Sequence, residues 1–385
     1  MGQILNLHVL RALTTMVVVL AHALMLVNRW AGFSDATLIA FELLGRMAVD
    51  TFFVISGFIM IHTSTGLFGR GTGALEFARR RLIRIVPLYW LATATEASLR
   101  SIHHRGPTLS ELLHSLLFVP QVVQPGQPLR PIVGVGWTLN YEVFFYILFG
   151  LALLLRRERG VAVLLSALVA IVAWGATEKP LTDTSLPTSA AAFLTDRIIL
   201  MFGVGVAIGF LCDRRGGSTP ERVRHPLVLS AWMTVITIVT VQHGGQSAYP
   251  SLSLDVVLRL SVIGGFLIFL FGSKVRAGRM VVILIVIGDA SYSIYLFHFL
   301  FLVGFEKIWL WSCGAHAATL CVLSISMLAL TGGGVLHYVV EKPITRRLGR
   351  LTATRPDRRG VTVEVKTQQR NTSLMTSIPN GGTSS

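Results

Sequence analysis

Ten segments of this sequence are apolar and long enough to cross a lipid bilayer as α-helices. About 20 apolar residues span a hydrocarbon core of about 30 Å, and a helix satisfies its own backbone hydrogen bonds there. The composition agrees, because 52% of the 385 residues are hydrophobic, 14% are charged and the mean hydropathy is +0.65. We therefore predict an all-α polytopic membrane protein with about ten transmembrane helices. The segments are residues 7–28, 40–62, 82–99, 137–155, 160–176, 192–212, 226–242, 255–272, 280–303 and 314–340.

Basic residues predict the orientation of these helices. One set of alternate connecting segments, together with the C-terminal tail, holds 24 Lys and Arg residues, and the opposite set holds six. Because basic segments stay on the cytoplasmic side, both termini are predicted to be cytoplasmic. This placement and the attraction to anionic membrane lipids account for the net charge of +15 without a nucleic-acid partner.

Two regions are predicted along the chain. Residues 1–345 form an integral-membrane domain, and residues 346–385 form a basic, polar and disordered cytoplasmic tail. A signal peptide over residues 1–23 is an alternative for the N-terminus, but apolar residues continue past its small-residue cleavage pattern. The cysteines have no metal-ligand spacing, and no zinc-protease or nucleotide-binding motif is present. We therefore expect no bound metal ion.

The first apolar segment contains Arg11 and His22, two ionisable residues that are costly to place in a membrane. Their separation is close to three helical turns, so they share one helix face and lie roughly 16 Å apart along the axis. Such residues normally face the protein interior, which makes this pair a candidate functional site. The alternative is that Arg11 extends to the membrane surface while His22 binds a neighbouring helix.

The second and third segments add more charges. Arg46 and Asp50 are four residues apart, so they either pair with each other or neutralise groups on the first segment. A cluster of arginines at the predicted cytoplasmic entrance to the third segment either binds lipid headgroups or clamps phosphates, and the phosphates of coenzyme A fit the second alternative. This cluster is Arg79, Arg80, Arg81 and Arg84.

The fourth segment begins at Trp137 and carries Glu142 roughly 8 Å inside the predicted outer boundary. His22 is predicted at a comparable depth, so the carboxylate of Glu142 can orient its imidazole, as acids orient bases in other catalytic sites. The alternative is that Glu142 pairs with another basic group and only holds helices together.

Polar residues interrupt the ninth segment. Asp289, Tyr292 and Tyr295 follow one another at three-residue steps, with Ser291 beside them and His298 one turn further. Together with Trp137, these hydroxyl and aromatic side chains suit contacts with a sugar. Aromatic residues also form belts at membrane interfaces, which is the alternative interpretation.

Taken in order, these motifs resemble the acyltransferase-3 family of bacterial membrane O-acyltransferases, in particular its exopolysaccharide O-acetyltransferase branch, which includes succinoglycan-type enzymes. The resemblance extends from residue 6 to about residue 345. It rests on Leu10-Arg11-Ala12 followed by His22, on Val49 to Phe58, Arg81 to Trp90, Trp137 to Tyr146 and Gly288 to His298, and on Glu341-Lys342-Pro343.

The resemblance implies transfer of an acetyl group from cytoplasmic acetyl-CoA to a hydroxyl of a glycan or lipid-linked saccharide at the bacterial inner membrane. Carried over by position, His22 is the catalytic base or a transient acyl acceptor, and Arg11 contacts the donor or polarises its thioester. Arg81 and Arg84 help to bind the donor, and Glu142 completes the predicted catalytic set. Polysaccharide export machinery is a candidate partner.

Two mechanisms stay open, namely direct attack by a sugar hydroxyl that His22 deprotonates, and a route through an acylated side chain. The rival function is a transporter or flippase, since many secondary carriers have ten spans with buried charges. A carrier predicts internal repeats, and the block from Trp137 to Tyr146 has no second copy. A scaffold or sensor gives no reason for an arginine cluster to accompany a buried histidine.

Overall fold

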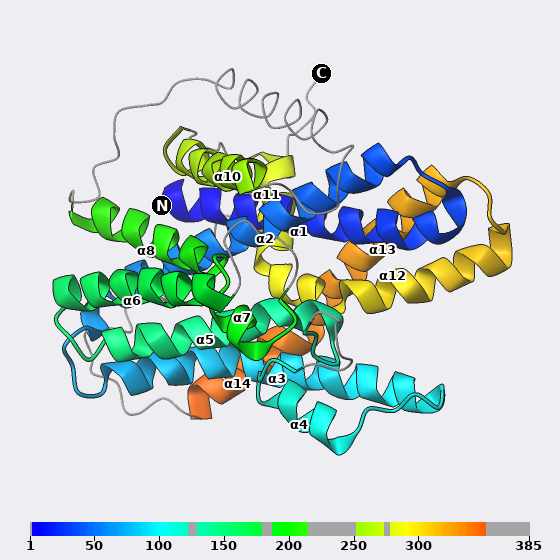
Figure 1. The fold of residues 1–385 in the computed structure, drawn as a ribbon. Coiled ribbons are helices and arrows are strands. Elements are labelled where there is room, and N and C mark those ends of the chain that lie inside the picture. The colour runs from blue at the N-terminus through cyan, green and yellow to red at the C-terminus, as the bar shows by residue number, and fades with distance from the viewer. Residues whose placement is uncertain (1, 122–128, 179–186, 215–251, 273–277, 352–385) are drawn as a thin grey trace, which may run out of the picture.

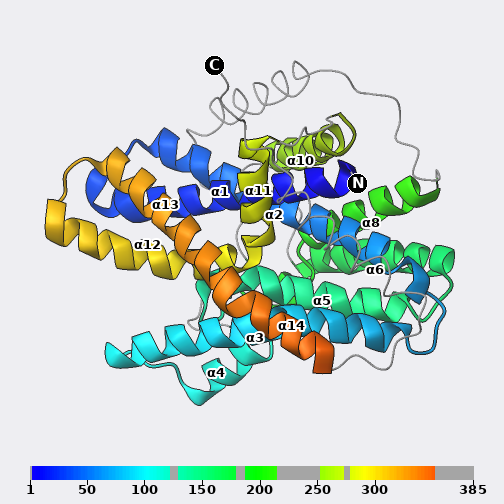
Figure 2. The same cartoon turned by 180° about the vertical axis from the view of Figure 1, so that it is seen from behind.

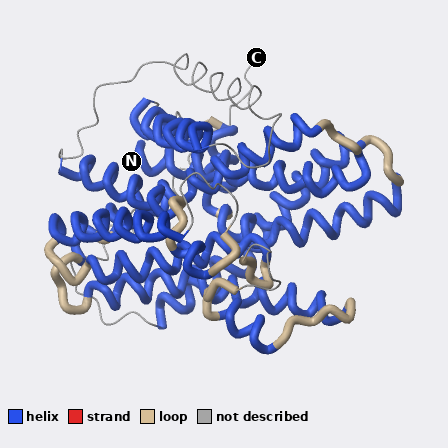
Figure 3. The backbone as a smooth tube through the Cα atoms, in the orientation of Figure 1, coloured by secondary structure: helices blue, strands red, loops and turns tan. Residues whose placement is uncertain are grey.

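The computed structural model describes residues 2–121, 129–178, 187–214, 252–272 and 278–351, and within them the secondary structure is entirely helical. Most of the long helices run side by side across the view of Figure 1 and are joined by short loops (Figure 3). Helix α11 is the exception, because it crosses the others steeply in both Figure 1 and Figure 2. The all-α prediction is confirmed for these residues.

The elements follow the apolar pattern of the sequence. The long helices are α1 (Gly2–Ala31), α2 (Asp35–Thr63), α3 (Gly73–Ile102), α5 (Trp137–Ala152), α6 (Arg157–Glu178), α8 (Ile199–Arg214), α10 (Leu252–Gly272), α12 (Ser291–Cys313) and α13 (Ala318–Leu336). Shorter elements are η1 (Thr65–Leu67), α4 (Leu109–Leu116), η2 (Gly134–Gly136), α7 (Ala190–Leu194), α11 (Arg279–Asp289), the π-helical turn η3 (His337–Glu341) and α14 (Lys342–Leu351).

Six stretches of the described residues are long and apolar enough to cross a membrane, and the chain is a multi-pass membrane protein. They are Asn6–Ala31, Gly134–Ala152, Arg157–Thr177, Ala190–Asp213, Ser291–Cys313 and Ala318–Leu351. The predicted span at residues 226–242 lies outside the described residues, as does most of the predicted tail. Helix α14 continues to Leu351, past the predicted domain boundary at residue 345.

Two segments that we predicted as single spans each consist of two helices. The segment at 192–212 is divided between α7 and α8, because the side chain of Asp196 accepts a hydrogen bond from the amide of Ile198 (2.8 Å) and starts a new helix. The segment at 280–303 is divided at Ala290, between α11 and α12. The predicted polar interruption is therefore a change in helix direction, as Figure 2 shows.

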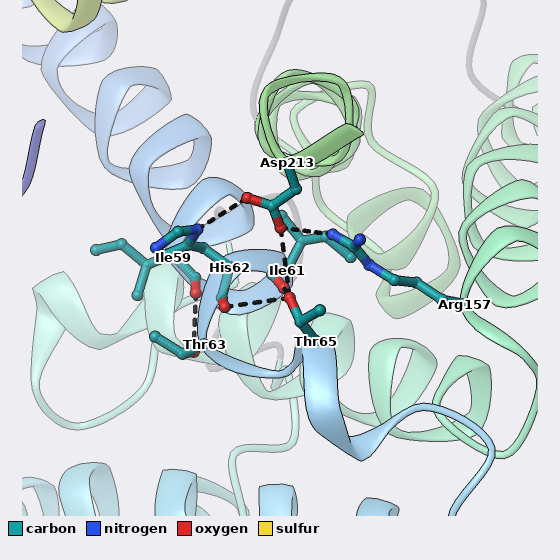
Figure 4. Close-up of polar contacts among 7 residues, drawn as sticks. All are labelled: Ile59, Ile61, His62, Thr63, Thr65, Arg157 and Asp213. Carbon is teal, nitrogen blue, oxygen red and sulfur yellow. Dashed lines mark hydrogen bonds and ion pairs between the residues drawn. The ribbon is translucent and has the colours of Figure 1, made fainter. Parts of the chain in front are cut away.

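The ends of α2, α5 and α8 lie at one side of the bundle, where polar contacts join them to neighbouring segments. The carboxylate of Asp213, at the end of α8, contacts His62 at the end of α2 (3.0 Å) and Arg157 at the start of α6 (2.5 Å), as Figure 4 shows. The amide of Gly69 also donates to the carbonyl of Leu153 (2.9 Å). The N-terminal parts of α3 and α6, which carry the arginine cluster and Arg157 with Arg159, therefore lie on the same side.

The opposite side is held by contacts between α1 and α12. Glu306 of α12 is 2% exposed and accepts hydrogen bonds from Arg29 (2.5 Å) and from the indole of Trp30 (3.1 Å). Between the two sides, α2 and α8 approach closely at glycines. A Cβ on Gly57 would lie 2.1 Å from the carbonyl oxygen of Phe202, so only glycine allows this helix spacing.

Candidate functional site

We consider two cavities among the described residues of the bundle. The first, which we call the arginine cavity, has a volume of about 120 Å³ and is lined by Arg11, Arg81 and Arg84 together with Glu142, Ser56 and Tyr146. The second, the histidine cavity, has a volume of about 280 Å³ and is lined by His22, Trp137 and a set of charged residues. Val49 and Tyr295 line both cavities, so the two spaces are neighbours.

The arginine cavity brings together residues from α1, α3, α5 and α12. Arg11 donates a hydrogen bond to the hydroxyl of Ser291 (2.7 Å), which is 2% exposed. The guanidinium of Arg81 lies 5.7 Å from the centre of the Tyr146 ring and donates to Thr63 (3.3 Å), at the end of α2. Seven of the eleven predicted site residues line this one cavity: Arg11, Arg81, Arg84, Glu142, Ser291, Tyr292 and Tyr295.

Glu142 is held by hydroxyl groups. It accepts hydrogen bonds from Ser56 of α2 (2.9 Å) and from Tyr146, one turn further along α5 (2.5 Å). The expected contact between Glu142 and His22 is absent from the described part of the chain, because the two side chains line different cavities. The four-residue spacing of Glu142 and Tyr146 is the sequence signal for the contact that the structure has instead.

His22 has a different partner, His298. The Nδ1 atom of His22 lies 2.9 Å from the carbonyl oxygen of Val18 and 3.3 Å from Nε2 of His298, and Nδ1 of His298 lies 2.6 Å from the carbonyl oxygen of Tyr295. Since carbonyl oxygens only accept, both Nδ1 atoms carry protons when the rings are neutral. The Nε2 atom of His22 is then unprotonated, and this side chain is arranged to act as a base.

Tyr292 and Tyr295 attach α12 to its neighbours. The hydroxyl of Tyr292 donates to the carbonyl of Ile85 in α3 (2.8 Å). The hydroxyl of Tyr295 donates to the carbonyl of Val135 (3.1 Å) and lies 2.8 Å from the hydroxyl of Thr138. These contacts hold α12 against α3 and against the start of α5.

The remaining predicted residues are dispersed. Trp137 lines the histidine cavity, while His298 is 0% exposed and lines neither cavity. Asp289, at the end of α11, also lines neither cavity and contacts His8 of α1 (2.7 Å). Asp289 and His298 are therefore not placed to meet a sugar in either cavity. The predicted sugar contacts that line a cavity are Trp137, Ser291, Tyr292 and Tyr295. Within the residues that the structure covers, no group of His, Cys, Asp or Glu side chains is placed to hold a metal ion.

Ion pairs line the histidine cavity. Arg259 of α10 contacts Asp255 (2.9 Å) and Asp50 of α2 (3.6 Å), while Arg46 contacts Glu42 (2.9 Å). The proposed pair of Arg46 with Asp50 is thus replaced by two other pairs. Our sequence analysis gave no role to Asp255 and Arg259, although opposite charges four residues apart inside an apolar segment signal such a site.

Loss of one partner from the Asp50–Arg259 pair should destabilise the protein. Asp50 is 6% exposed, and an uncompensated buried charge costs about 3–5 kcal/mol. We expect Arg259→Met to lower the unfolding temperature in detergent, and Asp50→Leu in the same chain to restore part of the loss. Arg80→Ala, which removes an exposed pair with Glu76 on α3, should cost less than about 1 kcal/mol. Additive losses in the double variant would contradict the coupling.

Comparisons with known proteins agree on one class of enzyme. A family described as an acyltransferase domain matches residues 4–336. The exopolysaccharide production protein ExoZ of Rhizobium meliloti (strain 1021) is 31% identical over 311 residues, which cover 79% of this chain and 90% of the relative. The acyltransferase MdmB of Streptomyces mycarofaciens is 26% identical over 346 residues, covering 82% of this chain and 85% of the relative. No solved structure matches the chain significantly.

Proposed function

This chain belongs to the acyltransferase-3 family and is an acyltransferase, and we propose that it transfers an acetyl group from acetyl-CoA to a hydroxyl of a cell-surface or exported glycan. The similarity to an exopolysaccharide production protein supports an exopolysaccharide precursor or polymer as the acceptor. The acceptor is a lipid-linked saccharide or a growing polymer, and polysaccharide export machinery is the expected partner.

We place the protein in the bacterial inner membrane with about ten spans, both termini in the cytoplasm, residues 1–345 as the membrane domain and residues 346–385 as a tail. The arginine-rich N-terminal parts of α3 and α6 lie at one side of the bundle, which supports this orientation. Arg81 reaches Thr63 at that same side. The arginine cavity therefore faces the cytoplasm, and the histidine cavity lies further toward the outer surface.

The observation that carries the proposal is this division of the site into two adjoining cavities. Arginine guanidinium groups suit the phosphates of coenzyme A, and Arg11, Arg81 and Arg84 all line the cavity on the cytoplasmic side. His22, the available base, lines the cavity that contains Trp137 and charged side chains, a lining that suits a sugar. Donor and acceptor thus approach from opposite sides of the membrane.

The reaction needs one base beside the acceptor hydroxyl. The hydroxyl proton passes to Nε2 of His22, the hydroxyl oxygen bonds to the acetyl carbonyl carbon, and the carbon–sulfur bond breaks. The thiolate of coenzyme A then takes the proton from the imidazolium. In a route through an acylated histidine the same Nε2 atom is the nucleophile, so both mechanisms depend on the proton that Nδ1 retains. Arg11 lies roughly 16 Å from His22 along α1, which favours donor binding over polarisation of the reacting thioester.

Replacement of His22 should abolish acetyl transfer while leaving the protein in the membrane. A general base contributes about 10²–10⁴-fold to the rate, so we expect His22→Ala to transfer no detectable acetyl groups. Mass spectrometry of surface polysaccharide from a deletion strain carrying wild type, His22→Ala or no copy should show the increment of about 42 Da per acetyl group only with wild type. Equal acetylation in all three, with different amounts of surface glycan, would instead support a transporter.

His298 should act through His22 and not through the sugar. We expect His298→Phe to lower kcat by about 10–100-fold, because Nδ1 of His22 loses one acceptor, with little change in KM for either substrate. His298→Gln should restore part of the rate, since its amide can donate to the Tyr295 carbonyl and accept from His22. A raised KM for the glycan at unchanged kcat would show that His298 binds sugar, as we predicted from the sequence.

Arg84 should bind the donor. It is exposed at the arginine cavity, and charge-assisted hydrogen bonds to phosphate are worth about 1.5–3 kcal/mol, so Arg84→Ala should raise KM for acetyl-CoA by about 10–100-fold. Arg80→Ala is the matched control, since Arg80 pairs with Glu76 on the same helix and lines neither cavity. Equal effects of the two substitutions would mean that the cluster acts only through its overall charge.

A further inference from the structure

The described lining of the histidine cavity includes four arginines and four acidic residues. Three of the arginines form ion pairs with acidic residues at 2.9–3.6 Å: Arg46 with Glu42, Arg197 with Asp255, and Arg259 with Asp255 and Asp50. The remaining acidic residue, Asp196, accepts a hydrogen bond from the amide of Ile198 (2.8 Å) at the start of α8. The fourth arginine, Arg130, has no acidic partner within the residues that the structure describes.

The backbone at Arg130 is held in place, while its side chain stays accessible. Leu129, Pro131 and Ile132 are buried, and Arg130 between them is exposed. Because Arg130 precedes a proline, its backbone is restricted to extended conformations. The amide of Leu129 also donates to the carbonyl of Pro187 (3.4 Å), and Pro187 itself lines the histidine cavity. The segment therefore presents one guanidinium group to this cavity.

Arg130 and His22 line the same cavity, and they are close enough for their charges to interact. Under the proposed function, on which this step rests, the acceptor hydroxyl lies at Nε2 of His22. The sugar that carries this hydroxyl is then beside Arg130. A guanidinium group is always charged and forms two parallel hydrogen bonds with a carboxylate or a phosphate. An anionic substituent on the acceptor would therefore complete the ion pairing of the cavity.

We propose that Arg130 binds an anionic group of the acceptor, so that the enzyme prefers a glycan with a carboxylate or a phosphate close to the hydroxyl that is acetylated. The carboxylate of an acidic sugar and the phosphate of a lipid-linked saccharide both have this chemistry. Charge-assisted hydrogen bonds of this kind change binding by about 10–100-fold. A neutral acceptor would leave the guanidinium of Arg130 to water.

The test measures acetyl transfer from acetyl-CoA, in membranes, to acceptors with and without the anionic group. Polysaccharide from a strain that lacks this gene is used as isolated and after its carboxylates are reduced to alcohols. A lipid-linked saccharide is used intact and after hydrolytic release from its lipid phosphate. Wild type and variant are compared on the same acceptor, so an effect of the lipid chain itself cancels.

We expect Arg130→Ala to raise KM for the anionic acceptor of one pair by about 10–100-fold at nearly unchanged kcat. KM for the neutralised acceptor of that pair should be the same for wild type and variant. The pair that shows the difference identifies the anion as a carboxylate or a phosphate. Arg130→Lys should retain part of the affinity, because the charge remains without the planar fork.

Arg105→Ala is the matched control. Arg105 is an exposed arginine in the connection between α3 and α4 and lines neither cavity, so its replacement should leave KM unchanged. Arg130→Gln, which is neutral and closer in length to arginine, should match Arg130→Ala and replaces it if the alanine variant fails to fold.

An unchanged KM with every acceptor would overturn the anion site at Arg130. A loss of kcat that is equal for anionic and neutralised acceptors would overturn it as well, because Arg130 would then act on the reacting atoms and not on an anionic substituent. A wild type that transfers acetyl to none of the acceptors would instead overturn the proposed function itself.

Discussion

Charged and polar side chains inside a membrane protein need partners, and this requirement determines how the helices of this chain meet. Arg11 binds Ser291, Glu142 binds Ser56 and Tyr146, and Asp50 faces Arg259. Each contact joins helices that are distant in sequence, except that between Glu142 and Tyr146. Because an unpaired charge in hydrocarbon costs several kcal/mol, these contacts select one arrangement of helices that are otherwise apolar on all sides. The polar groups that meet inside the bundle also line the two cavities.

Helix α12 connects most of these contacts. Its side chains at Ser291, Tyr292, Tyr295 and His298 reach α1, α3, the turn before α5, and α1 again. These four residues are one to three positions apart, so their side chains lie along one side of α12, from the arginine cavity toward His22. The change in direction at Ala290 makes this arrangement possible. Because of it, α12 begins beside Arg11 and does not extend along the axis of α11.

Sequence analysis predicted the elements and most of the arginine cavity but assigned the partner of His22 incorrectly. Depth in the membrane follows from position along a helix, and on that basis Glu142 and His22 are at similar depth. Position along a helix does not determine which helices are neighbours or how each is rotated, because both depend on tertiary packing. For the same reason the spacing of Arg46 and Asp50 left open a local pair or contacts with the first segment. In the structure Glu42 lies one turn away on the other side of Arg46, and Arg259 faces Asp50 from α10.

The division into two cavities also bears on a side reaction, the hydrolysis of the donor thioester by water. A thioester that reached an open, water-filled channel beside a base would be hydrolysed, because water competes with the sugar hydroxyl for the same proton acceptor. In this chain the three arginines proposed to bind the donor (Arg11, Arg81 and Arg84) and the base line separate cavities. Tyr295 lines both cavities, with its hydroxyl bound to Val135 and its carbonyl bound to His298. Tyr295 therefore contacts both the turn before α5 and the residue that orients the base. Because the bond to His298 is made by the backbone carbonyl of Tyr295, replacement of the tyrosine side chain removes the contact with Val135 and leaves the acceptor for His298 in place.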